Sequence, residues 1–121
     1  MPKHVMTVDD SRTMREMVGF TLRKAGFDVS EAEDGQQALV ALRTTRVDVI
    51  ITDLNMPRMD GVSLIRALRS DPKYRATPIL MLTTESDVSK KSEGKNAGAT
   101  GWLVKPFDPD KLIDVVKRVA G

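Results

Sequence analysis

Cysteine is absent from the 121 residues, which excludes disulfide bonds, thiolate metal sites and cysteine nucleophiles. Histidine occurs once, as His4, so a catalytic triad or a multi-histidine metal site would have to be built on that residue alone. Aromatic residues make up 4% of the chain and the net charge is +2, a composition with neither a base-stacking surface nor a basic field for nucleic acid. No apolar run approaches the ~18 residues that span a membrane. We therefore expect a cytoplasmic protein that binds neither nucleic acid nor membrane.

The composition is that of an ordinary folded domain, with 40% hydrophobic and 30% charged residues. A chain of this length can bury its own core but is too short for two typical domains. We expect a single monomeric domain spanning residues 1–121, with no output domain, whose chemistry is carried by carboxylates, hydroxyls and lysine.

Short apolar runs alternate along the chain with longer segments of helical period. Residues 5–8, 47–52 and 79–83 are branched and nearly unbroken, which is typical of parallel strands covered on both faces. Residues 27–30 and 101–104 are weaker strand candidates. Strict alternation of five strands with five helices predicts an α/β fold, a doubly wound five-stranded parallel sheet of the flavodoxin-like type.

Four of the helices are preceded by residues that cap helix N-termini: Ser11, Asp34, Asp60 and Asp108. The first helix ends before Gly26 and carries residues at helical spacing: Met14, Met17, Val18, Thr21, Leu22 and Ala25. Residues 86–97 are lysine-rich and offer the core mainly Val88 and Ala97. We expect the helix in this segment to be the most loosely held.

Ligands of doubly wound sheets bind beyond the carboxyl ends of the strands. The polar residues at those ends are Asp9, Asp10, Asp53, Thr83, Thr84 and Lys105. Three carboxylates about 5 Å apart repel one another by about 3 kcal/mol per pair at a dielectric constant of about 20, so a cation is expected among them. Carboxylates without imidazole or thiolate ligands indicate Mg²⁺.

A carboxylate beside Mg²⁺ and a lysine can act as a nucleophile that forms an acyl phosphate. Asp53 is the predicted nucleophile, because it ends the most apolar central strand, between the acidic pair and Lys105. Each residue also has a plainer interpretation taken singly: the acidic pair could cap a helix, Asp53 could begin a turn, and Lys105 could be solvated.

Four separated runs carry a family resemblance: V-D-D-S-R-T-M-R at 8–15, D-L-N-M-P-R-M-D-G at 53–61, L-T-T-E at 82–85 and K-P-F at 105–107. In this order they resemble the response-regulator receiver domain of two-component systems, closest to its CheY-like chemotaxis members. The resemblance spans the whole chain. It implies the sheet order 2-1-3-4-5 and a cis peptide bond between Lys105 and Pro106.

The resemblance also implies site roles. Asp53 is the phospho-acceptor, and Thr83 and Lys105 contact the phosphoryl group. The implied Mg²⁺ site consists of Asp10 as direct ligand, Asp9 through water, Asp53, and the main-chain carbonyl of Asn55. Asn55 and Glu85 flank the expected path of the hydrolytic water, so they are expected to set the phosphoryl lifetime. The protein would catalyse its own phosphoryl transfer and dephosphorylation without being a turnover enzyme.

Trp102 stands three residues before the lysine, where receiver domains commonly have tyrosine or phenylalanine that swings inward on activation. An indole needs more room and a partner for its N–H. Three alternatives stay open for this switch position: Trp102 swings inward with Thr83, it remains outside as an anchor for a partner, or it is a half-buried edge aromatic without a role.

The implied partners are a CheA-like sensor histidine kinase and a FliM-like flagellar motor switch protein. An alternative is a phosphate sink or relay receiver without motor output. A flavodoxin-like electron carrier is a distant alternative, because two carboxylates follow the first strand where a flavin phosphate needs hydroxyl and glycine residues. An aspartyl phosphatase is disfavoured because Asn55, two residues after Asp53, cannot donate a catalytic proton.

Overall fold

The computed structural model describes residues 2–84 and 88–121, in which strands and helices alternate. The strands are β1 (His4–Val8), β2 (Asp28–Ala32), β3 (Val49–Asp53), β4 (Ile79–Thr83) and β5 (Gly101–Val104). The helices are α1 (Arg12–Lys24), α2 (Gly35–Leu42), α3 (Gly61–Ser70), α4 (Val88–Ala97) and α5 (Pro109–Ala120). None of the described helices is long and apolar enough to span a membrane.

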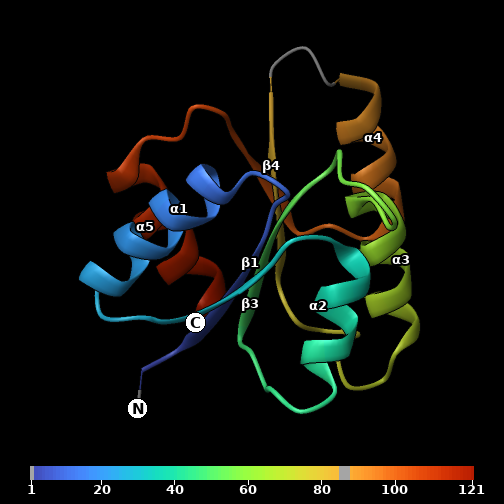
Figure 1. Cartoon of the computed structure of the whole chain (residues 1–121), viewed down its shortest axis with the longest axis horizontal. Coiled ribbons are helices and arrows are strands. Elements are labelled where there is room, and N and C mark those ends of the chain that lie inside the picture. The colour runs from blue at the N-terminus through green and yellow to red at the C-terminus, as the bar shows by residue number, and fades with distance from the viewer. Residues whose placement is uncertain (1, 85–87) are drawn as a thin grey trace.

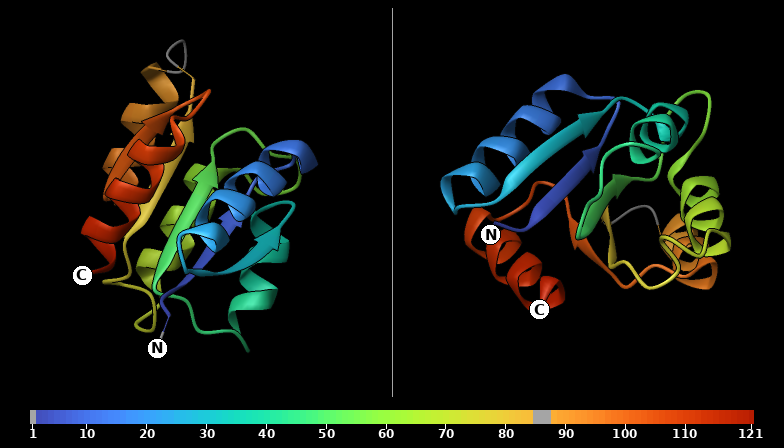
Figure 2. Two further views of the ribbon diagram at one scale, coloured as in Figure 1. Left: turned by 90° about the vertical axis from the view of Figure 1, so that its left-hand side faces the viewer. Right: turned by 90° about the horizontal axis from the view of Figure 1, so that it is seen from below.

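The five strands form one parallel sheet in the order β2-β1-β3-β4-β5, so the predicted fold and strand order are confirmed. Helices α1 and α5 cover one face of the sheet, and α2, α3 and α4 cover the other (Figure 1). The strand arrows point the same way in Figure 2, so all carboxyl ends meet at one edge. This edge is where the doubly wound fold places a ligand.

The core consists of two apolar clusters, one on each face of the sheet. β3 and β4 lie between them and are buried along their whole length. They supply residues to both clusters because successive side chains of a strand point to opposite faces. The rigid centre of the sheet thus carries the last residues of β3 and β4, Asp53 and Thr83.

Three strands differ from the sequence prediction in their bounds. β1 begins at His4 rather than at residue 5, β2 runs over Asp28–Ala32 rather than 27–30, and β3 runs over Val49–Asp53 rather than 47–52. β2 is an edge strand with polar residues, so an apolar run does not define its limits. Val47 is buried but precedes the ladder, which shows that apolar character alone does not distinguish a strand from a buried loop residue.

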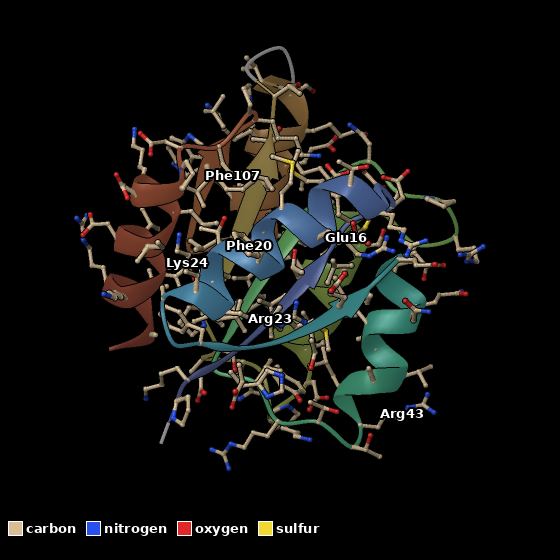
Figure 3. All side chains as sticks on the ribbon, turned by 60° about the vertical axis from the view of Figure 1, so that its left-hand side comes forward. Glu16, Phe20, Arg23, Lys24, Arg43 and Phe107 are labelled. Carbon is tan, nitrogen blue, oxygen red and sulfur yellow. The ribbon has the colours of Figure 1, made fainter. Side chains whose placement is uncertain are left out.

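All four predicted helix caps are confirmed. The side chains of Ser11, Asp34, Asp60 and Asp108 each accept a hydrogen bond from a main-chain N–H in the first turn of α1, α2, α3 and α5. In α1, Val18 and Leu22 are buried as expected, but Met17 is 49% exposed. Phe20 is 68% exposed on the same helix, beside Lys24 and the groove toward α5 (Figure 3).

The prediction that Val88 faces the core is wrong, because its side chain is 63% exposed at the start of α4. Gly94 is the only buried residue of α4, all of which is described. A Cβ at position 94 would lie 2.1 Å from the sulfur of Met81 on β4, so any side chain there would force Met81 to move. Ala97 packs against the apolar core as expected. α4 therefore contacts the core through small residues rather than through a stripe of large apolar side chains.

Candidate functional site

Two acidic residues converge at the carboxyl edge because of strand register. β1 and β3 are neighbours, and Val8 pairs with Thr52, so the residues that follow this pair are Asp9 and Asp53. Together with Asp10, they place carboxylate oxygens within 4.8 Å of one another. Asp9 and Asp53 are buried, whereas Asp10 is exposed. The structure thus brings together the three carboxylates that the sequence places at strand ends.

Lys105 reaches this cluster from the end of β5, the strand at one border of the sheet. It follows β5, and its main-chain N–H donates to the Thr83 carbonyl oxygen at 2.7 Å. Its Nζ lies 3.2 Å from Asp9 Oδ2 and 3.2 Å from Asp53 Oδ1. The peptide bond to Pro106 is cis, which confirms that expectation. One ammonium therefore bridges the two buried carboxylates.

Burial and charge perturb the protonation equilibria of this pair. The pKa of Asp53 is raised, first because burial removes water from its carboxylate and second because Asp9 repels it, against the lowering effects of Lys105 and the Leu54 N–H. Burial alone lowers the pKa of Lys105, but the two carboxylates together outweigh it and raise that pKa. The surroundings therefore favour the charged form of Lys105 and disfavour the charged form of Asp53.

The donor set fits a hard divalent cation. Within the described part of the chain, Asp9 Oδ2 is a buried side-chain oxygen that accepts no hydrogen bond and has only its ion pair with Lys105. Asp9 Oδ1 accepts from the Ser11 N–H at 2.9 Å, and Asp53 Oδ1 accepts from the Leu54 N–H at 2.8 Å. One carboxylate oxygen from each of Asp9, Asp10 and Asp53 lies within 4.8 Å of the other two, and oxygen-only ligands favour Mg²⁺ or Ca²⁺ over softer metals.

Thr83 lies at the carboxyl edge beside Lys105, whereas Trp102 lies further back on β5. Thr83 ends β4, is buried, and its hydroxyl donates to the Thr84 carbonyl oxygen at 3.3 Å. Trp102 pairs with Met81 on β4 and is 41% exposed. The Nζ atoms of Lys91 and Lys95 lie 4.6 and 5.0 Å from its ring centre. The indole therefore occupies the outward position in this structure, against the lysine face of α4.

Of the two residues expected to set the phosphoryl lifetime, the structure describes only Asn55. Asn55 is exposed and lies two residues after Asp53, in the loop that joins β3 to α3. Glu85 lies outside the described residues. Asn55 therefore belongs to the rim of the candidate site, and the role of Glu85 stays a prediction.

Arg15 belongs to the site although the sequence reasoning did not select it. Its side chain is 9% exposed, and Nη1 donates to the Asp9 carbonyl oxygen at 2.7 Å. Its Nε lies 3.4 Å from Glu31 on β2. The signal in the sequence is its position: Arg15 precedes Val18 and Leu22 by three and seven residues, on the buried side of α1. A charged residue on an apolar stripe needs a buried partner.

Known proteins are similar to this chain in sequence and in fold. The family model for the response regulator receiver domain matches residues 5–117. The chain is 38% identical over 116 residues to the chemotaxis protein CheY of Pseudomonas aeruginosa, covering 95% of this chain and 94% of that one. It is 38% identical over 117 residues to the DNA-binding response regulator MtrA of Mycobacterium tuberculosis, covering 97% of this chain and 50% of MtrA. The solved structure of the chemotaxis response regulator CheY4 of Vibrio cholerae matches with a TM-score of 0.92 at 50% identity, covering 98% and 99% of the two chains.

Proposed function

Because the chain belongs to the family of response regulator receiver domains, we propose that Asp53 accepts a phosphoryl group from a phosphohistidine of a sensor kinase. The observation that carries the proposal is the buried Asp53 carboxylate with the Lys105 ammonium at 3.2 Å and two further carboxylates within 4.8 Å. This arrangement supplies a nucleophile, a fixed cation and ligands for a second cation in one place.

In the proposed step, a carboxylate oxygen of Asp53 attacks the phosphorus atom, and the bond between phosphorus and the imidazole nitrogen breaks. The imidazole leaves and takes a proton from solvent, so an acyl phosphate replaces the phosphoramidate. Lys105 pairs with the transferred phosphoryl oxygens, which carry the developing charge. Asp9, Asp10, Asp53 and the Asn55 carbonyl would hold Mg²⁺, which neutralises further charge when bound.

The transfer is tested by incubation with radiolabelled acetyl phosphate or a phosphorylated kinase and Mg²⁺, followed by mapping of the labelled residue. We expect one label, on Asp53, and no label in Asp53→Asn. Asp28→Asn is the matched control, since it removes an exposed carboxylate on β2 and should be labelled like the parent. A label on any other residue would overturn the proposed nucleophile.

For the output, we propose a CheY-like chemotaxis regulator that acts in the cytoplasm and binds a flagellar motor switch protein when phosphorylated. The chemotaxis relatives and this chain match over nearly their whole lengths, which favours a receiver that signals by non-covalent binding. Trp102 with Lys91 and Lys95 offers an exposed aromatic and positive charge on one face for such a partner.

A phosphate sink or relay receiver is the second candidate, and the match to MtrA shows that similar receivers also serve regulators outside chemotaxis. Binding of a purified motor switch protein, measured with and without phosphorylation, separates the two. The chemotaxis output requires tighter binding by the phosphorylated protein. Equal binding in both states favours the sink or relay.

A further inference from the structure

The loop after the candidate nucleophile contains an unusual backbone conformation. Arg58 has φ 65°, and among residues 2–84 and 88–121 it is the only non-glycine residue with positive φ. This left-handed conformation costs an L-residue with a Cβ about 1 kcal/mol or more, and arginine has no short side chain to offset the cost locally. A contact elsewhere must therefore hold Arg58 in place.

That contact is a buried carboxylate at the start of α2. Arg58 Nε donates to Asp34 Oδ2 at 2.7 Å, and Nη2 contacts the same oxygen. The Asp34 side chain is 2% exposed, and its other oxygen accepts from the Gln37 N–H at 2.9 Å. Asp34 thus uses one oxygen to cap α2 and the other to hold the loop. These hydrogen bonds lower the pKa of Asp34, the Gln37 N–H most and Arg58 next among the favourable contacts.

A second contact joins the same two segments. The Gly35 N–H donates to the Met59 carbonyl oxygen at 3.1 Å. A Cβ at position 35 would lie 2.7 Å from Met59 Cγ and 2.9 Å from that oxygen, so glycine allows the loop to approach α2 this closely. At the opposite end of the loop, the Gly61 N–H donates to the Leu54 carbonyl oxygen at 3.0 Å. Residues 54–61 are therefore fixed to both β3 and α2.

We propose that Arg58 is a positioning residue for the divalent cation, because its ion pair with Asp34 fixes the loop that carries Asn55. The inference rests on the proposed function, in which the Asn55 main-chain carbonyl is a ligand. Loss of the ion pair would leave that carbonyl to be ordered at the moment of binding, which lowers the affinity.

The change in cation affinity distinguishes a positioning role from a purely electrostatic one, because only the positioning role predicts weaker binding. Arg58 lies five residues after Asp53, in the loop that joins β3 to α3. Removing its positive charge should strengthen the binding of a cation, or leave it unchanged, if charge alone matters. Removing a positioning contact should weaken it. Arg58→Gly is the informative variant, since glycine adopts positive φ without strain while the ion pair is lost. Arg46→Gly is the matched control: it removes the same charge from an exposed arginine that precedes β3, at the amino-terminal edge of the sheet.

The experiment is calorimetric titration of each purified full-length variant with MgCl₂, after confirming by circular dichroism that the protein is folded. We expect Arg58→Gly to raise the dissociation constant for Mg²⁺ by about tenfold, which is the usual effect of losing a contact that orients a metal ligand. Arg46→Gly should match the parent. Asp34→Asn keeps the oxygen that caps α2 but removes the negative charge that pairs with Arg58. The double variant Asp34→Asn/Arg58→Gly should therefore lose no more affinity for Mg²⁺ than Arg58→Gly alone.

The outcomes separate this inference from the proposed function. If the parent binds Mg²⁺ and Arg58→Gly binds it equally or more tightly, Arg58 does not position the site. An additive double variant would likewise show that Arg58 and Asp34 do not act as one unit. If the parent itself binds no Mg²⁺, the metal site of the proposed function fails and this inference fails with it.

Discussion

Replacement of Asp53 by asparagine should stabilise the metal-free protein. Asparagine has nearly the same shape, and its Oδ1 can still accept the Leu54 N–H that donates to Asp53 at 2.8 Å. The substitution removes the repulsion from Asp9, which is at least about 3 kcal/mol at a dielectric constant of about 20, because the two carboxylates approach within 4.8 Å. It also removes the attraction to Lys105, about 5 kcal/mol at 3.2 Å on the same scale.

These two charge interactions alone would favour the aspartate by at most about 2 kcal/mol, and repulsion from the exposed Asp10 reduces this preference further. Burial reverses the balance, because Asp53 is 8% exposed and desolvation of a buried carboxylate costs several kcal/mol. The raised pKa of Asp53 has the same sign, since burial and Asp9 together outweigh Lys105. We expect a net gain of about 1 kcal/mol at pH 7, which corresponds to about 4 °C in melting temperature for a chain of this size.

The assay is thermal unfolding at pH 7 in excess chelator, followed by circular dichroism, for the parent, Asp53→Asn and the control Asp28→Asn. The control removes one exposed carboxylate from β2 and should melt within about 1 °C of the parent. Added Mg²⁺ should raise the melting temperature of the parent more than that of Asp53→Asn. A melting temperature of Asp53→Asn clearly below the parent's in chelator would refute the reasoning, because Lys105 would then outweigh desolvation and repulsion.

Four further outcomes are expected. Mg²⁺ should stabilise the parent by about 2.7 kcal/mol at a hundredfold excess over its dissociation constant, and Asp10→Ala should abolish most of this shift; survival of the shift would exclude Asp10 as a direct ligand. Lys105→Ala should be phosphorylated but should bind its output partner no better than the unphosphorylated protein, and normal output binding would contradict its role. Phosphorylation should change the fluorescence emission of Trp102, and Thr83→Ala should reduce that change; identical spectra before and after phosphorylation would remove Trp102 from the switch. Asp34→Asn should lower the free energy of unfolding by about 1–2 kcal/mol at pH 7. Because the pKa of Asp34 is lowered in the folded state, that difference should vanish as the pH falls through it; a difference independent of pH would exclude the ion pair as its cause.

The parts of the fold that were predictable from the sequence are those with a local signal. β4 begins and ends where its apolar run does, and each helix cap is a short-range contact between a side chain and a main-chain N–H three residues or fewer away. The convergence of Asp9, Asp53 and Lys105 followed from a topological rule, because parallel strands end at one edge. This rule, together with the strand assignments, was enough to predict that the three side chains lie close together.

The parts that were not predictable depend on long-range packing or on pairing among many charges. Asp34 and Arg58 are 24 residues apart, and with 36 charged residues in the chain no pattern singles out this pair. The packing of α4 was predicted only in part: Ala97 packs against the core as expected, but the close approach of Gly94 was missed, because glycine carries no apolar signal and its contact is defined by Met81 on another element. Val88 was selected for its apolar side chain, yet the register of the helix points it to solvent.

The two borders of the sheet bear on how the protein behaves at high concentration. A strand at a border presents unpaired main-chain groups that can template the addition of another chain, the first step of aggregation. Here one border, β2, carries Asp28 and Glu31, and the other, β5, is four residues long. The lysines of α4 that lie over Trp102 place positive charge beside β5. Glu31 is paired with Arg15 and Arg23, so among the described residues the unpaired exposed charge on β2 comes from Asp28, whereas β5 is protected by its shortness and by the neighbouring lysines. We therefore expect charge and short strand length to disfavour the pairing of a further strand at either border.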